Sequence, residues 1–170
     1  MISDKQRFMR ILDEHQGILI NLCSIYYDNP KDQQDAFQDV AIQLWKSFKS
    51  FKGDSKLSTW IYKVALNTLL NKKRREKRRA LEITSLDQAA TLPLREDQGV
   101  DDDCQLLMKL ISGLGDKDKA ILILHLEGYS NKEIASSLSM SQSNVSTRMN
   151  RAKNTLKGKL EDNKKWRLRI

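Results

Sequence analysis

Apolar residues recur every three or four positions along most of this chain, and this helical period constrains its fold more than any other feature of the sequence. The pattern is clearest over residues 8–26, 36–48, 57–68, 106–125 and 145–160. No segment shows the sustained alternation of apolar and polar residues that is typical of a β-strand. The sequence therefore predicts an all-α fold.

Two helical blocks flank a segment that has no helical period. Residues 1–80 are expected to form one small bundle, and residues 104–163 are expected to form a second small helical domain. Between them, residues 81–103 contain one Pro and one Gly and are expected to form a flexible acidic linker. A basic tail at residues 164–170 completes the predicted organisation.

Several helix ends are marked by residues that cap helices. Ser3 or Asp4 is expected to be the N-cap of the first helix. Ser130, with Glu133 three positions later, has the pattern of a capping box. Ser141 is expected to cap a long final helix.

The charge of the chain is divided into blocks of opposite sign. The 170 residues include 30 Lys and Arg against 22 Asp and Glu, a net charge of +8. Residues 1–80 and 104–170 each carry a net charge of +7, whereas residues 81–103 carry −6. Two cationic modules are typical of proteins that bind a polyanion, and nucleic acid is the first candidate for this polyanion. A solvated basic surface without a partner is the alternative.

Other features exclude several classes of protein. No apolar run approaches the roughly 18 residues that a membrane helix needs, and the first residues lack the apolar block of a signal peptide. A soluble, cytoplasmic protein without membrane insertion is therefore expected. The two Cys and two His residues lack the spacing of a metal site, so neither a metal nor a cofactor is expected.

A tight helix-turn-helix is predicted near the end of the second block. This motif needs a small residue where the two helices approach each other, a compact turn four positions later, and a β-branched or aliphatic residue ten positions later that packs between the helices. These positions are occupied by Ala135, Ser139 and Val145, and Ser139 stands in place of the usual glycine. Polar and basic groups on the early part of the second helix can then reach base edges and phosphates. An ordinary helical hairpin with a polar surface is the alternative. The candidate DNA-binding residues are Lys132, Gln142, Ser143, Asn144, Ser146, Thr147, Arg148 and Arg151.

Aromatic side chains adjoin a strongly basic run in the first block. A loop that contains Gly53 precedes Trp60, and seven of the nine residues at 71–79 are basic. Stacking on an aromatic ring contributes about 1–3 kcal/mol per base, and extruding a base costs a few kcal/mol, so such a loop can hold an opened duplex without ATP. Phe51 lies off the helical stripe and is the preferred base-contacting residue, whereas Trp60 lies at core spacing and is expected to be mostly structural.

Together, the two blocks resemble the extracytoplasmic-function (ECF) group of bacterial RNA polymerase sigma factors. Residues 32–67, which include FKGDS and TWIYKVALN, are similar to region 2 of that family, and residues 114–160 are similar to its region 4. The resemblance implies a subunit that directs core RNA polymerase to specific promoters and opens the −10 region without ATP. It implies core polymerase, promoter DNA and an anti-sigma factor as partners, although no residue identifies the last of these.

The resemblance also implies roles for particular residues. The recognition helix would read the −35 element, the second domain would also rest on the polymerase flap, and the linker would thread the RNA channel. The residues expected to bind the clamp helices of the largest polymerase subunit are Asp35, Gln38, Asp39, Gln43 and Lys46. The residues expected to capture a flipped base or to contact −10 DNA are Phe51, Lys52, Ser55, Lys56, Trp60, Lys63, Asn67, Asn71, Lys72, Arg74 and Arg75.

Two other function classes account for parts of the sequence. A stand-alone helix-turn-helix regulator explains residues 104–170 but leaves the loop and aromatics of the first block without a role. A nuclease would need a metal held by Asp101, Asp102 and Asp103, but consecutive carboxylates in a linker do not converge on one ion. No matched set of acid, base and nucleophile is present, so no enzymatic activity is expected.

Overall fold

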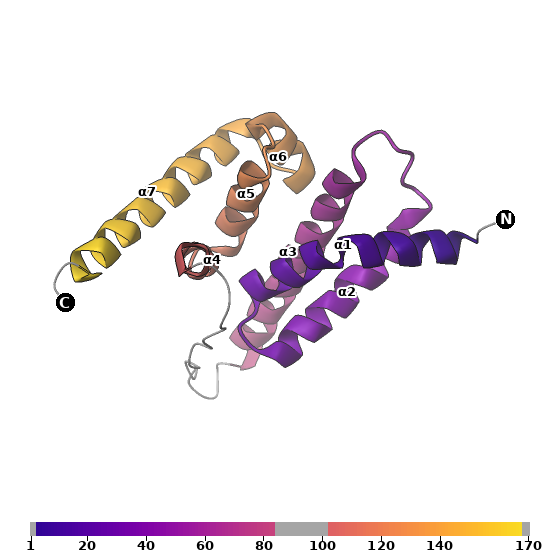
Figure 1. Ribbon diagram of the computed structural model, residues 1–170, viewed down its shortest axis with the longest axis horizontal. Coiled ribbons are helices and arrows are strands. Elements are labelled where there is room, and N and C mark those ends of the chain that lie inside the picture. The colour runs from indigo at the N-terminus through magenta and orange to yellow at the C-terminus, as the bar shows by residue number, and fades with distance from the viewer. Residues whose placement is uncertain (1–2, 84–101, 168–170) are drawn as a thin grey trace. The chain divides into compact units, whose positions relative to one another are not determined.

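The computed structural model describes residues 3–83 and 102–167 (Figure 1). The chain divides into two compact units, residues 1–97 and 98–170, and each unit is described by itself. Every regular element in the described ranges is an α-helix. The predicted all-α fold with two helical domains is confirmed.

Residues 3–83 of the first unit form a bundle of three helices that all pack against one another (Figure 1). Their bounds are α1 Asp4–Tyr26, α2 Pro30–Phe48 and α3 Leu57–Ile83. The predicted apolar stripes of the three helices meet in one core, because each helix contributes fully buried side chains to it. The largest of these side chains are Leu19 and Leu22 from α1, Val40 from α2, and Ile61, Leu66 and Leu69 from α3.

Side-chain caps fix where the first two helices begin. The Ser3 hydroxyl accepts a hydrogen bond from the Gln6 backbone N–H at 3.2 Å, and the Ser3 N–H donates to Gln6 Oε1 at 3.0 Å. Of the two predicted N-caps, Ser3 is therefore the one used. At the start of α2, Asn29 Oδ1 accepts from the Lys31 N–H at 2.9 Å, and Pro30 occupies the first helical position, where its missing N–H costs nothing.

Residues 102–167 of the second unit form four helices, of which α5, α6 and α7 pack against one another while α4 packs on α7. Their bounds are α4 Asp102–Ser112, α5 Asp116–Leu126, α6 Asn131–Leu138 and α7 Gln142–Arg167. The fully buried side chains Ile121, Leu124, Ile134 and Val145 come from the three helices that pack together. These helices therefore share one core.

The turn between α6 and α7 has the geometry of the predicted helix-turn-helix. Ser139 adopts a left-handed conformation, with φ 52°, and its N–H bonds to the Ala135 carbonyl. The Met140 N–H also bonds to the Ala135 carbonyl, at 2.9 Å. Ala135 and Val145 are both buried where the two helices meet, as their spacing predicts. Ser141 caps α7, since its Oγ accepts from a backbone N–H in the first turn at 3.2 Å.

Two helices continue beyond their predicted ends. α3 reaches Ile83 instead of residue 80, and α7 reaches Arg167, so the predicted tail at 164–170 begins inside a helix. Most of the predicted linker, residues 84–101, lies outside the described residues, and so does Asp101. Among the helices that are described, none combines the length and apolar character needed to cross a membrane.

Candidate nucleic-acid interface

Five of the predicted −10 residues form one stripe along α3. Trp60, Lys63, Asn67, Asn71 and Arg74 follow one another at spacings of three or four residues, which places them on one face of the helix. Lys63, Asn71 and Arg74 are exposed, and Trp60 and Asn67 are half-buried. The stripe extends for about 21 Å at 1.5 Å per residue. It is therefore long enough to follow several nucleotides of a strand.

The loop between α2 and α3 lies at the Trp60 end of this stripe. Lys52, Ser55 and Lys56 are all exposed in the loop, as expected for residues that contact a ligand. Gly53 turns the chain with φ +80°, a conformation that a residue with a side chain rarely adopts. The loop thus presents two cations and a hydroxyl next to the aromatic end of the stripe.

Phe51 and Trp60 contact each other, which the sequence did not indicate. Their ring centroids lie 5.1 Å apart, and Trp60 also lies 6.4 Å from Phe48. Phe48 is in turn 5.6 Å from Phe8, which is buried in the core. Phe51 and Trp60 are both half-buried. Phe51 therefore packs against Trp60. Trp60 itself is half-buried against Phe48 and Phe51 and is not a fully buried core residue.

The basic run of α3 has an inner and an outer side. On the inner side, Lys72 Nζ lies 2.6 Å from Asp39 Oδ2, and Lys73 Nζ lies 3.6 Å from the centroid of the Tyr27 ring. The Tyr27 hydroxyl donates to Glu76 Oε1 at 2.9 Å. These contacts attach α3 to α2 and to Tyr27, the C-cap residue of α1. Arg74 and Arg75 are exposed on the outer side.

Arg78 is a further cation that the sequence reasoning missed. It follows Arg74 by four residues and is exposed, so it extends the α3 stripe by one turn. The signal was present in the sequence, since the steps of three or four residues that lead from Trp60 to Arg74 continue to Arg78. The density of charge over residues 71–79 hides the division of these cations between two faces of the helix.

Four of the five residues predicted to bind the polymerase clamp lie on the side of α2 that faces away from the core, and Asp39 lies at the edge of this side next to α3. Ala36, Val40 and Leu44 are buried on the opposite side. Ile42, which was not predicted as a site residue, lies among these polar residues and is 53% exposed. The predicted residues are half-exposed at Asp39 and exposed at Asp35, Gln38, Gln43 and Lys46.

On α7, most of the residues predicted to read DNA are exposed, and several of them also form hydrogen bonds within the second unit. Ser146 is half-buried, and its Oγ accepts from Asn131 Nδ2 of α6 at 3.0 Å. Thr147 is exposed, although its Oγ1 donates to the Ser143 carbonyl at 2.9 Å. Asn150 was missed; it is exposed and follows Thr147 by three residues on the same face. The other exposed candidates are Lys132, Gln142, Ser143 and Asn144.

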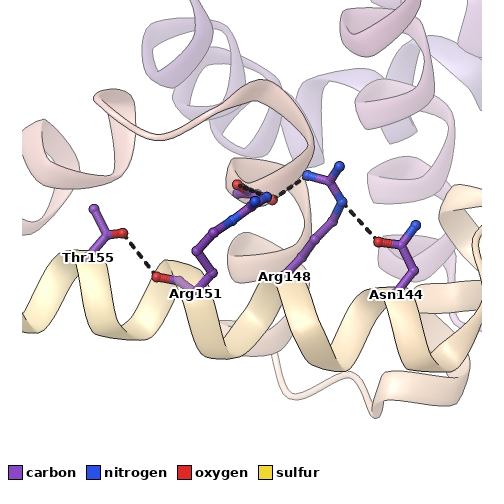
Figure 2. A network of polar contacts seen from close by, with 5 residues as sticks. Asn144, Arg148, Arg151 and Thr155 are labelled. Carbon is purple, nitrogen blue, oxygen red and sulfur yellow. Dashed lines mark hydrogen bonds and ion pairs between the residues drawn. The ribbon is translucent and has the colours of Figure 1, made fainter.

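Arg148 and Arg151 are both directed at one carboxylate. Figure 2 shows the two guanidinium groups next to one carboxylate, which the hydrogen bonds identify as that of Asp118 on α5. Arg148 Nη1 donates to Asp118 Oδ1 at 2.8 Å, and Arg151 Nη2 donates to Asp118 Oδ2 at 3.2 Å. Arg148 Nε also donates to Asn144 Oδ1 at 3.1 Å. The two arginines thus lie on the flank of α7 that faces α5.

Within the part of the chain that the structure describes, Cys23 and Glu133 have shifted pKa values. Burial raises the pKa of the Cys23 thiol to about 11, and the charge of nearby Lys72 opposes this only in part. Hydrogen bonds from the Ser130 side chain and backbone lower the pKa of Glu133, as expected for the predicted capping box. Both groups therefore contribute to the fold, since Cys23 is buried in the core and Glu133 belongs to the capping box of α6. No group of three or more metal-ligating side chains occurs among the described residues.

Comparison with protein families gives a match in each unit. The family model for sigma-70 region 2 matches residues 11–79, and the model for sigma-70 region 4 matches residues 104–156. The ECF RNA polymerase sigma-E factor of Escherichia coli (strain K12) is 26% identical over 171 residues, which cover 94% of this chain and 89% of that protein. The RNA polymerase sigma-H factor of Pseudomonas aeruginosa is 29% identical over 69 residues, covering 41% of this chain and 36% of that protein.

Two solved structures share the fold. The sigma factor RpoE from Bartonella quintana, in complex with the anti-sigma factor NepR, has a TM-score of 0.69 at 20% identity and covers 92% of this chain and 96% of its own. CnrH, in complex with the cytosolic domain of CnrY, has a TM-score of 0.61 at 19% identity and covers 94% of this chain and 91% of its own. Since the two sigma-70 models together match more than half of the chain, in the order region 2 and then region 4, the chain belongs to the sigma-70 family of RNA polymerase sigma factors, in its ECF group.

Proposed function

We propose that this chain directs core RNA polymerase to specific promoters and opens the −10 region without ATP. The observation that carries the proposal is the α3 stripe, which starts at the Phe51 and Trp60 pair and continues through Asn67 to Arg74. An aromatic pair offers a stacking surface for an extruded base, and the polar and cationic residues beyond it can contact the same strand. A stacking contribution of about 1–3 kcal/mol per base is comparable to the cost of extruding one.

Each unit has its own part in this proposal. Residues 1–80 bind polymerase and −10 DNA, and residues 104–163 bind the −35 element through α7. On α7, exposed Ser143, Thr147 and Asn150 present hydroxyl and amide groups that can bond to base edges in the major groove. The linker at 81–103 joins the two activities, and its acidic side chains suit a path through the cationic RNA channel of the polymerase.

The outward side of α2 is the proposed contact for the clamp helices of the largest polymerase subunit. Asp35, Gln38, Asp39, Gln43 and Lys46 supply polar contacts, and Ile42 adds an apolar contact at the centre of this side. Interface cores combine an apolar centre with a polar rim, which is the arrangement found here. The second unit is proposed to rest on the polymerase flap.

The proposed function also implies a regulatory partner and a location in the cell. The solved structure of RpoE contains the anti-sigma factor NepR, and that of CnrH contains the cytosolic domain of CnrY. We infer that an anti-sigma factor also binds this chain. Because the polymerase supplies the chemistry of RNA synthesis, we assign the chain no catalytic activity of its own, and we place it in the cytoplasm.

Reconstituted transcription tests the proposal. Purified chain is added to core polymerase with a library of upstream fragments from its own genome, and transcripts are mapped at their 5′ ends. Specific starts that require both the chain and the core enzyme are expected. DNA binding by the chain without any association with core polymerase would support the stand-alone helix-turn-helix regulator instead.

A further inference from the structure

Asp118 of α5 binds the two arginines that the sequence assigns to DNA contact. Its carboxylate is only 14% exposed, and each of its oxygens accepts a hydrogen bond from a different guanidinium group. The Arg148 side chain is 28% exposed and is held at two nitrogens, by Asp118 and by Asn144. The Arg151 side chain is 62% exposed and has a single bond, at 3.2 Å, to the carboxylate.

Because of this arrangement, Arg148 and Arg151 differ in how readily they can bind a DNA phosphate. Hydrogen bonds between a guanidinium and a carboxylate are charge-assisted and stronger than neutral ones, so a DNA phosphate must displace Asp118 to engage the bonded side of Arg148. Arg151 keeps most of its donors directed at solvent and can meet a phosphate without leaving Asp118. The three side chains together present one net positive charge where the two arginines alone would present two.

We propose that Asp118 is a specificity-determining residue for DNA binding by the second unit. By neutralising one guanidinium charge and retaining Arg148, it limits sequence-independent attraction to duplex phosphates. Affinity then depends more on the base-reading face of α7, where Ser143 and Thr147 lie. The inference rests on the proposed function, because the surface that Asp118 adjusts is the proposed DNA-binding surface.

The salt dependence of DNA binding measures the number of phosphates engaged, at a slope of about 0.9 per phosphate in a plot of log affinity against log salt. The full-length chain and its D118N variant are titrated onto a labelled duplex of random sequence, followed by fluorescence anisotropy from about 50 to about 200 mM salt. D118N is expected to steepen the slope by about 1 and to bind several-fold more tightly at the lowest salt. An unchanged slope would overturn the proposal.

Glu127 provides a matched control, because it lies exposed at the other end of α5 and E127Q removes the same charge. E127Q is expected to keep the wild-type slope, and an equal steepening by E127Q would show a general charge effect and reject the proposal. Circular dichroism checks that each variant is folded. If D118N does not fold, D118S, which removes the same charge with a smaller side chain, is expected to steepen the slope by about 1, and an unchanged slope in D118S rejects the proposal. The proposed function fails separately, if the wild-type chain gives no core-dependent transcription starts.

Discussion

Lys72 Nζ of α3 lies 2.6 Å from Asp39 Oδ2 of α2, so a cation of the proposed DNA-binding run is bonded to a residue of the proposed polymerase-binding side. Both side chains are half-buried. The bond directs Lys72 inward, whereas Arg74, two residues later, is exposed on the outer stripe. The two cations therefore differ in role although they are neighbours in the sequence.

Substituting these cations separately should reveal the difference. We expect K72M to lower the free energy of unfolding by about 0.5–1 kcal/mol, the contribution of a partly exposed ion pair, and to change the salt dependence of DNA binding little. R74M should leave stability unchanged and reduce the salt slope by about 0.9. Urea denaturation and salt titrations measure the two effects. Equal loss of slope in the two variants would contradict the assignment.

The α2 side can be tested with two isoleucines of similar exposure. Ile42 on α2 is 53% exposed, and Ile20 on α1 is 55% exposed. We expect I42A to weaken association with core polymerase by about 1 kcal/mol or more, because an apolar side chain at the centre of an interface loses its buried area. I20A is the control and should keep wild-type affinity, with similar melting curves for both variants. Equal affinities measured by biolayer interferometry would remove Ile42 from the interface.

Replacement of Phe51 separates base capture from DNA binding. F51A should spare the closed promoter complex but reduce duplex opening by roughly 5-fold or more, since one stack contributes about 1–3 kcal/mol. F51L keeps much of the apolar contact with Trp60 and loses the aromatic face, so it should show the same opening defect. Permanganate reactivity of thymines in the −10 region reports opening. Normal opening by F51L would show that Phe51 acts only by supporting Trp60.

The helices could be predicted from the sequence because their signals are local. Apolar spacing located each helix, and the Ser3 and Ser130 caps located two of the starts. α3 and α7 extend beyond the ends that the sequence predicts, because neither helix has a proline or a left-handed glycine there and the polar residues at these positions are compatible with helix.

Contacts between distant residues could not be predicted in the same way. Lys72 and Asp39 are 33 residues apart, and Arg148 and Asp118 are 30 residues apart. Periodicity gives the face of a helix on which a residue lies, but the partner on that face depends on how the helices pack. The sequence therefore indicated Arg148 as a DNA contact, and only the packing of α7 on α5 revealed its carboxylate partner.

The thiol of Cys23 is expected to be inert in the folded chain. It is 2% exposed, and its pKa of about 11 leaves roughly one thiolate in a thousand at pH 8. Because the folded pKa lies above the ordinary value of 9.0, the stability associated with this thiol is complete below pH 9 and is lost as pH rises from 9 toward 11. Iodoacetamide should label Cys23 in urea but not in buffer, as read by mass spectrometry. Rapid labelling of the folded chain would contradict the burial.

Ser139 is expected to be a site where a substitution stabilises the protein. A residue with a Cβ in the left-handed region costs about 1–2 kcal/mol, and glycine avoids this cost but loses about 0.5–1 kcal/mol through the greater freedom of the unfolded chain. Ser139 is exposed and has φ 52°, so S139G should raise the free energy of unfolding by about 0.5–1 kcal/mol. The reverse change, G128A at φ +88°, should lower it by about 1 kcal/mol or more. Urea denaturation of the three proteins measures both effects, and a neutral or destabilising S139G would show that the serine side chain supports the turn in a way that outweighs the backbone strain.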